Sequence, residues 1–355
     1  MSLVLHVDTP AWRAHLRTVR DDTPGLVPVA KGNGYGFGLE RLAAEALVLD
    51  VDTIAVGTTP EVARVRAGGW DRDIVVLTPW SKHDPLAVTL LSDPRVITTV
   101  SRVDDLKEVI ERRPRARVIC ELLTSMRRHG LGPADLGTLR TLVGTAQLAK
   151  VQVDEVQFEG WTIHLPMKSA DPLGEARSLV RAATAIAEAP VWLSHLSAAD
   201  YATLRSELNV DTRLRLGTQL WLGAPKTRRT TARVLDLHPI KRGDRVGYWQ
   251  RRVRQDGWIV VVSGGTAHGV ALTAPTSAAT LKQRLVTLTA GVMDATGNAL
   301  SPYTIAGKKR MFIEPPHMQS SLVFLPGAAS VAIGDEIPVE LRLTTATVDE
   351  VIDSQ

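Results

Sequence analysis

A lysine followed by a run of glycines is the first candidate for chemistry in this chain. Residues 27–38 read VPVAKGNGYGFG, so a short apolar run ends at Lys31, and four glycines follow at alternating positions around Tyr35. An apolar run that passes directly into glycines is typical of a buried strand that opens into a tight loop. The charge of a lysine is costly to bury, so Lys31 is expected either to pair or to lose its proton.

The chemistry open to Lys31 depends on its protonation. A neutral lysine amine is a nucleophile towards carbonyl groups, including the aldehyde of pyridoxal phosphate (PLP). A glycine-rich turn that merely follows a lysine explains the motif equally well. The place of Lys31 in the fold must decide between the two interpretations.

The chain alternates between strand-like and helix-like patterns from residue 27 to residue 220. The early strand-like runs are nearly continuous in apolar, often β-branched residues, which is typical of parallel strands covered by helices. Eight strands that alternate with helices predict a (β/α)8 TIM-type barrel of the α/β class. The predicted strands are 27–30, 53–57, 74–78, 96–100, 116–123, 158–164, 191–195 and 214–220. The predicted helices are 39–49, 60–67, 85–91, 102–112, 134–148, 173–188 and 198–208.

The pattern changes after residue 224. Strand-like runs are separated by glycine, aspartate and proline, and long amphipathic helices become scarce. We expect a barrel domain at residues 1–229 and a mostly β domain at residues 230–355, with the first few residues packed with the β domain. The strand-like runs are 233–237, 258–262, 322–325 and 337–343, and the main helix candidate is 279–286.

Polar residues gather where the predicted barrel strands end, which is the face that carries the active site in such barrels. Lys31 follows the first strand, Glu121 lies in the fifth, His164 ends the sixth and Arg215 lies in the eighth. A lone histidine such as His164 is more often a hydrogen-bonded core residue than a ligand. Glu121 is harder to explain structurally, because an unpaired buried carboxylate is costly, and Arg128 or Lys31 is its expected partner.

Small polar residues follow the seventh and eighth strands. His195 ends the seventh strand and Ser197 follows it, while Gly217 and Thr218 lie in the eighth. Loops at this place, together with a helix N-terminus, often bind phosphate in this fold. A lysine, a tyrosine, an arginine and a phosphate site describe PLP better than a sugar or a metal, for which no His, Asp or Glu spacing is convincing.

The composition narrows the class of protein. With 355 residues, a formal net charge of +4 and no run of five basic residues, the chain gives little support for nucleic-acid binding. Cys120 is the single cysteine, so no intrachain disulfide forms. Residues 1–16 lack a basic leader before a long apolar segment, and no stretch of 18 apolar residues occurs. We therefore expect a cytoplasmic protein without a membrane span.

These motifs together resemble those of the alanine racemase family, PLP enzymes built from a barrel and a β domain. KGNGYGFG at 31–38 resembles the family's K-x-N-A-Y-G-H-G, and TSMRRHG at 124–130 resembles T-G-M-x-R-x-G. RLG at 215–217 resembles R-P-G, and GWTIH at 160–164 resembles G-x-x-T-H with isoleucine in place of the threonine. The resemblance covers essentially the whole chain.

The resemblance implies a role for each matching residue. Lys31 would be the Schiff-base lysine, and Arg128 would lie near the cofactor and the substrate carboxylate. Tyr35 would contact the cofactor phosphate, His164 its ring and Arg215 its pyridine nitrogen.

The chain also departs from the family pattern. Glu121 stands where the family often has a carbamylated lysine, and a glutamate can do the same electrostatic work as the carbamate. The family's phosphate-binding serine falls at Ala199, so Ser197 would replace it. The family's M-D-Q segment, which lines the entrance, resembles Met318 and its neighbour Gln319, without the aspartate.

The largest departure concerns the second catalytic base, a tyrosine in the family's G-Y-A-D-G segment. Residues 265–269 read GTAHG, so Thr266 takes the place of the tyrosine. A hydroxyl is a poor general base, whereas His268 has a suitable pKa range and would point to the same side if the segment is extended. The family takes this segment from the other subunit, which implies a homodimer with shared active sites.

We therefore expect a PLP-dependent amino-acid racemase for a small amino acid, with Lys31 as one base and His268 or Thr266 as an altered second base. One alternative is a PLP enzyme of the same fold with one-sided chemistry at Cα. A PLP-binding protein without activity is another, and a class I aldolase that uses Lys31 without PLP is more distant.

Overall fold

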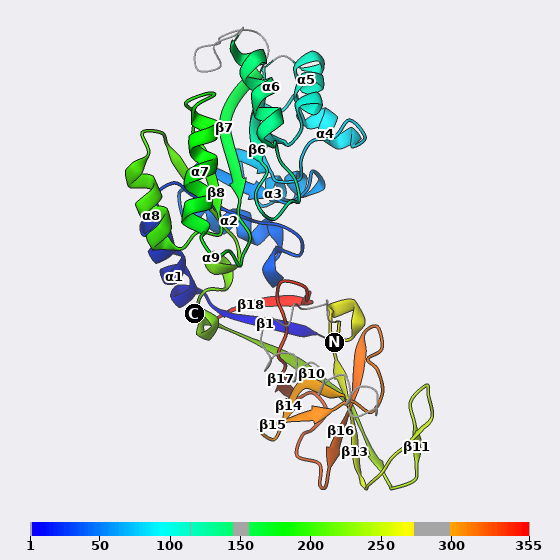
Figure 1. Cartoon of the computed structure of the whole chain (residues 1–355). Helices are drawn as coiled ribbons and strands as arrows, with labels where there is room; N and C mark the ends of the chain where they lie inside the picture. Colours follow the sequence, from blue (N-terminus) through cyan, green and yellow to red (C-terminus); the bar gives the residue numbers. More distant parts are fainter. Residues whose placement is uncertain (1, 114, 145–155, 273–298, 355) are drawn as a thin grey trace. The chain divides into compact units, whose positions relative to one another are not determined.

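A computed structural model describes residues 2–113, 115–144, 156–272 and 299–354. The chain divides into two compact units (Figure 1). The barrel unit comprises Arg13–Gly34 and Gly38–Gly223, and the β unit comprises Met1–Trp12, Tyr35–Phe37 and Ala224–Gln355.

The barrel unit contains an eight-stranded parallel sheet that nearly closes, which confirms the predicted fold. The strand order is β2-β9-β8-β7-β6-β5-β4-β3, and a single parallel bridge between Val29 and Ala55 joins its two ends. Ala30 N donates a hydrogen bond of 2.8 Å to Ala55 O beside this bridge. The strands are β2 (Leu26–Pro28), β3 (Thr53–Val56), β4 (Asp73–Val76), β5 (Val96–Val100), β6 (Ala116–Leu122), β7 (Val156–His164), β8 (Val191–Ser194) and β9 (Thr212–Leu216).

Helices alternate with these strands along the chain (Figure 1). Local signals start them, as at α4, where the Asp84 side chain accepts hydrogen bonds from Leu86 N and Ala87 N ahead of a proline in the first turn. Among the described residues, no helix combines the length and the apolar character needed to cross a membrane. The helices are α1 (Thr9–Asp21), α2 (Leu39–Val48), α3 (Pro60–Ala67), α4 (Pro85–Leu90), α5 (Val103–Arg112), α6 (Pro133–Gly144), α7 (Pro172–Thr184), α8 (Ala198–Glu207) and α9 (Thr218–Leu222).

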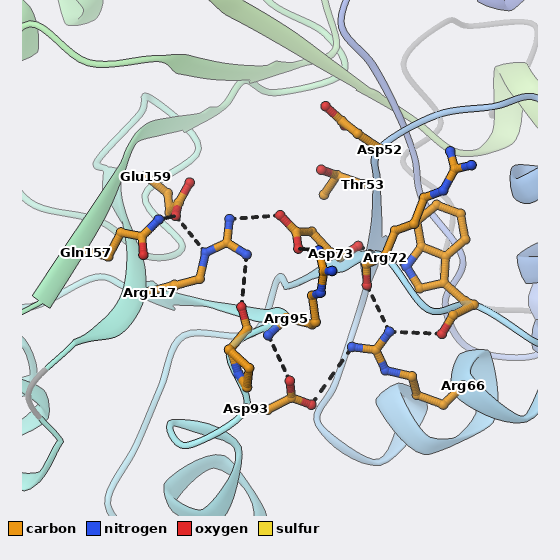
Figure 2. A network of polar contacts seen from close by, with 12 residues as sticks. Asp52, Thr53, Arg66, Arg72, Asp73, Asp93, Arg95, Arg117, Gln157 and Glu159 are labelled. Atoms are coloured by element: carbon orange, nitrogen blue, oxygen red, sulfur yellow. Dashed lines mark hydrogen bonds and ion pairs between the residues drawn. The ribbon is translucent and has the colours of Figure 1, made fainter.

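The side chains of β6 mark three layers inside the barrel. Arg117, Ile119 and Glu121 alternate along the strand and therefore point to the same side. At the amino end, Arg117 pairs with two carboxylates: its Nη2 lies 2.8 Å from Asp73 Oδ2, and its Nε lies 2.6 Å from Glu159 Oε1 (Figure 2). Ile119 belongs to an apolar middle layer, and Glu121 belongs to a polar layer at the carboxyl end. The middle layer consists of Val27, Val29, Ala55, Val75, Ile97, Ile119 and Trp192.

The β unit is organised around a mixed sheet in the order β16-β13-β10-β1-β18, with β17 also paired to β10. The first strand of the chain, β1, runs antiparallel to β10 and parallel to β18. The first residues thus pack with the β unit. Its strands are β1 (Leu3–Asp8), β10 (Arg228–Ile240), β11 (Arg245–Val246), β12 (Arg251–Arg252), β13 (Gly257–Ser263), β14 (Leu300–Ile305), β15 (Lys308–Met311), β16 (Ser320–Pro326), β17 (Glu336–Pro338) and β18 (Glu350–Ser354).

Two predicted strands end well before their predicted limits, and the run predicted over 233–237 is part of the longer strand β10 (Arg228–Ile240). The eighth barrel strand ends at Leu216 rather than at residue 220, because Gly217 leaves the extended conformation, with φ −114° and ψ −89°, and α9 begins at Thr218. In the β unit, the run predicted over 337–343 is a strand only as far as Pro338. The helix predicted at 279–286 lies outside the described residues.

Candidate active site at the carboxyl ends of the barrel strands

Lys31 lies just beyond β2, on the face that the polar layer occupies. Val29 N donates to Leu216 O and Ala30 N to Ala55 O, each at 2.8 Å, so the backbone stays in the barrel wall up to the lysine. Lys31 is exposed to solvent at the barrel mouth, but the surrounding protein still partly desolvates its amine. Desolvation and the positive charge of Arg128 lower the pKa of Lys31 below its usual value, Arg215 adds to the effect, and the carboxylate of Glu61 opposes it. A lowered pKa enlarges the neutral, nucleophilic fraction of the amine.

Arg215 is buried in β9 and fixed by acceptors from the two preceding strands. Its Nη2 donates to Ile163 O and to Ser194 Oγ, both at 3.0 Å, and its Nε donates to Leu193 O at 3.4 Å. Burial lowers the pKa of Arg215 to about 10, and the charge of Glu121 counteracts part of this effect. The guanidinium therefore stays charged at neutral pH.

The same serine connects Arg215 to His164. Ser194 Oγ accepts from Arg215 Nη2 at 3.0 Å, lies 2.9 Å from His164 Nδ1 and donates to Ile163 O at 3.5 Å. Burial, followed by the charge of Arg215, lowers the pKa of His164 to about 3, so the ring is neutral at physiological pH. The ring of His195 packs against it edge to face, with centroids 4.8 Å apart.

Glu121 is buried in β6, in register with Thr162 of β7. Burial raises the pKa of Glu121, and the charges of Arg215 and Arg128 oppose the shift. Within the described residues, Glu121 Oε2 and Thr162 Oγ1 have no hydrogen-bond partner. The charge of Arg128, one of its two predicted partners, acts on Glu121, although the described residues show no ion pair between Glu121 and either Arg128 or Lys31. The strongest opposite charge on Glu121 is the buried Arg215, because Arg128 lies exposed on a loop.

The loop that carries Arg128 is held at its beginning. Thr124 Oγ1 donates to His164 O at 3.0 Å, and Ser125 donates to the Glu175 carboxylate through its amide, at 2.6 Å, and its hydroxyl, at 2.9 Å. The charge of Arg128 contributes to the lowered pKa values of both Lys31 and His164. The structure thus brings Lys31, Glu121, Arg128, His164 and Arg215 together on one rim of the barrel.

Three of the residues predicted to bind phosphate, Ser197, Gly217 and Thr218, occupy helix starts on the same rim. Ser197 Oγ accepts from Asp200 N at 3.0 Å and lies 2.7 Å from Asp200 Oδ2, so this hydroxyl already caps α8. Gly217 precedes the short helix α9, whose first residue is Thr218. Tyr35 belongs to the β unit, where it is buried with a left-handed backbone at φ 55°.

His268 is buried in the β unit with both ring nitrogens in hydrogen bonds. Its Nε2 lies 3.0 Å from Asp349 Oδ1, and its Nδ1 accepts from Gly265 N at 3.3 Å. Thr266–His268 forms a 3-10 turn, so the extended geometry that would point His268 to the same side as Thr266 is not present. His268 must give up one of these bonds before it can exchange a proton.

Thr266 and Met318 lie beside each other in the β unit. Thr266 N donates to His317 O at 2.8 Å, and Ala267 N donates to Met318 O at 3.0 Å. The side chain of Met318 is 69% exposed. The segment matched to the second base and the segment matched to the entrance are therefore bonded backbone to backbone.

The comparisons with known proteins agree with this geometry. The family model described as "Alanine racemase, N-terminal domain" matches residues 7–225, more than half of the chain. The chain belongs to the alanine racemase family. The alanine racemase of Mycobacterium tuberculosis is 28% identical over 166 residues, and that of Symbiobacterium thermophilum is 32% identical over 166 residues. Each match covers 45% of this chain and only 41% of the relative.

Solved alanine racemases share the fold along nearly the whole chain of this family member. The alanine racemase of Clostridium difficile 630 has a TM-score of 0.74 at 14% identity, covering 100% of this chain and 96% of its own. The alanine racemase of Bartonella henselae, solved with covalently bound pyridoxal phosphate, has a TM-score of 0.73 at 16% identity and covers 100% of both chains. These likenesses extend the shared fold through the β unit.

The sequence did not single out two residues that contact the predicted site of this alanine racemase relative. Ser194 reads as an ordinary residue near a strand end, although alternation from Trp192 would have placed it inside the barrel. Glu61 reads as an acidic residue in a first helical turn, yet one of its oxygens accepts from Gly32 N at 2.7 Å, directly after Lys31. The hydrogen bond between Gly32 and Glu61 joins residues 29 positions apart, and no pattern in the sequence predicts it.

Proposed function

We propose that this protein is a PLP-dependent amino-acid racemase for a small amino acid. The observation that supports it most is Lys31 at the carboxyl end of β2, with its pKa lowered by desolvation and by Arg128 and Arg215, in a chain of the alanine racemase family. Lys31 would carry PLP and serve as one base.

The rim suits the chemistry of PLP. An aldehyde requires a neutral amine, which the lowered pKa of Lys31 favours. Ser197, Gly217 and Thr218 would hold the phosphate at the starts of α8 and α9, with Tyr35 as a further ligand. PLP, when bound, withdraws electrons from the bonds at the substrate Cα.

Arg215 and His164 would hold the cofactor ring. Arg215 stays charged at neutral pH and would donate a hydrogen bond to the pyridine nitrogen, which keeps that nitrogen unprotonated and limits side reactions. His164 is neutral and would contact the ring. Because Ser194 bonds to both residues, it would keep them in a fixed relation.

Arg128 would bind the substrate carboxylate. Its exposed guanidinium lies on a loop anchored by Thr124 and Ser125, so it is available at the mouth of the barrel. Glu121 would supply negative charge behind the two arginines of the rim.

The second face of Cα needs a proton carrier from another part of the protein. We propose the segment at residues 265–269, supplied by the second copy in a homodimer, with His268 or Thr266 as the carrier and Met318 at the entrance. Thr266 is the more accessible of the two, whereas His268 is the better base but is held by Asp349 and Gly265.

The test is proton exchange at Cα in deuterium oxide. Purified protein with PLP should incorporate deuterium into both enantiomers of alanine or another small amino acid and interconvert them. His268→Asn and Thr266→Ala should each be compared with His238→Gln, which changes another histidine paired to a carboxylate in the same unit. Loss of exchange from one enantiomer in one of the first two variants identifies the second base.

Two outcomes would replace racemisation by another function. Exchange without inversion in the wild-type protein supports a PLP enzyme with one-sided chemistry at Cα. Absence of exchange for every amino acid, despite PLP on Lys31, supports a PLP-binding protein without activity.

A further inference from the structure

Glu61, in the first turn of α3, binds backbone groups from two separate loops of the barrel. Its Oε1 accepts from Gly32 N at 2.7 Å, and its Oε2 accepts from Gly57 N at 2.6 Å and Thr58 N at 3.1 Å. Gly32 directly follows Lys31, whereas Gly57 and Thr58 follow β3. One carboxylate therefore joins the carboxyl ends of β2 and β3.

These are the two strands at which the barrel closes. β2 and β3 are the first and last members of the sheet order, and the bridge between Val29 and Ala55 is short. A short join leaves few backbone hydrogen bonds to keep the two strands in register. Glu61 adds a tie immediately beyond this join, on the side where Lys31 emerges.

Helix capping explains only part of this arrangement. An acidic residue in a first helical turn commonly accepts from nearby amides, and the bonds from Gly57 and Thr58 are of that local kind. Gly32 lies 29 residues earlier in the chain, so its bond to Glu61 is a tertiary contact. Capping of α3 does not require it.

The side chain of Lys31 starts beside the same carboxylate. A Cβ atom placed on Gly57 would lie 3.1 Å from Lys31 Cβ and 3.0 Å from Glu61 Oε2, so glycine leaves room for both. The charged and titratable side chains that act on the Lys31 amine come from several elements. Arg128 and Arg215 lower the pKa of Lys31, whereas the carboxylate of Glu61 raises it. The charge of Lys31 in turn lowers the pKa values of His164 and His195.

We propose that Glu61 is a positioning residue for Lys31: it fixes the loop after the lysine to the end of β3 and places a carboxylate beside the lysine side chain. This inference rests on the proposed function, in which Lys31 carries PLP. Glu61 acts through Lys31 and needs no contact with the substrate.

The experiment measures how the apoprotein captures PLP on Lys31. Protein without cofactor is mixed with PLP over a range of pH, reduced with borohydride, and digested, and the modified fraction of the Lys31 peptide is measured by mass spectrometry. Glu61→Gln removes the charge, and Glu61→Asp keeps the charge but shortens the side chain. Glu40→Gln is the matched control, since it neutralises an exposed carboxylate on the neighbouring helix that pairs with Arg64.

In Glu61→Gln the pH midpoint of capture should move downward, because loss of the carboxylate lowers the pKa of Lys31 further and the neutral amine is the reactive form. In Glu61→Asp the pH midpoint of capture should not change, because the charge is kept. The capture rate should fall about tenfold or more, since displacing a reacting group by about 1 Å can lower a rate by up to ~100-fold. A role confined to helix stability would not move the midpoint.

Behaviour of both Glu61 variants like that of Glu40→Gln would overturn the inference. If Glu61→Gln does not fold, as judged by thermal unfolding, the capture rate of Glu61→Asp decides alone. Absence of capture on Lys31 in the wild-type protein would instead refute the proposed function, so the two failures are distinguishable.

Discussion

Replacing Ser194 by alanine tests how the rim holds its two central side chains. Ser194 is buried, and its hydroxyl accepts from Arg215 Nη2 at 3.0 Å and lies 2.9 Å from His164 Nδ1. A hydrogen bond to a charged group contributes about 1.5–3 kcal/mol and a neutral one about 1 kcal/mol. Because Nη2 keeps Ile163 O as an acceptor, we expect Ser194→Ala to lower the free energy of unfolding by about 2–4 kcal/mol.

The assay is urea-induced unfolding of the apoprotein, followed by tryptophan fluorescence. Ser206→Ala is the control, because Ser206 is exposed on α8 and its hydroxyl donates to Thr203 O at 2.7 Å within the same helix, so the expected change is within about 0.5 kcal/mol. If Ser194→Ala changes the free energy of unfolding no more than Ser206→Ala does, the account of Ser194 as the link between Arg215 and His164 is wrong.

Three further predictions concern other parts of the barrel. Arg117→Met should destabilise the protein by about 2–4 kcal/mol in the same unfolding assay, because it leaves Asp73 and Glu159 without their shared cation at the amino end of the strands (Figure 2); an unchanged midpoint would contradict this. The pKa of His164 is about 3 in the folded protein against 6.5 for an unperturbed histidine, so the unfolded chain binds a proton first as the pH falls. Stability should therefore decline by about 1–2 kcal/mol between pH 6.5 and 5, and less in His164→Gln, as measured by unfolding at each pH. Burial raises the pKa of Cys120 to about 12, so a thiol reagent should modify it only after the protein unfolds; rapid labelling of the native protein would refute its burial.

Most of the barrel could be predicted from the sequence because its strands are continuous apolar runs between capped helices. The exception is instructive: the apolar residues Leu220 and Trp221 continue the pattern of β9, yet they belong to α9, since Gly217 turns the chain. Where apolar residues continue beyond a glycine, the hydrophobic pattern does not show that the strand has ended.

The positions of the rim residues could be predicted from the sequence, but most of their hydrogen-bond and charge partners could not. Lys31, His164 and Arg215 follow from where strands end, and alternation sets the side on which they lie. The links between them depend on packing of separate strands, as when Ser194 bridges Arg215 and His164 or Glu61 reaches Gly32. Charge alone predicts Arg128 as a partner of Glu121, and Arg128 does act on it, but the larger effect comes from the buried Arg215, which the sequence did not indicate.

The measurement that tests the central proposal most directly is the absorption spectrum of the purified protein with PLP. The account predicts a visible band of lysine-bound PLP in the wild-type protein that Lys31→Ala abolishes and Lys226→Ala, which changes a lysine in the short helix Pro225–Thr227, leaves intact. A band that persists in Lys31→Ala, or a wild-type protein that shows none, would contradict it.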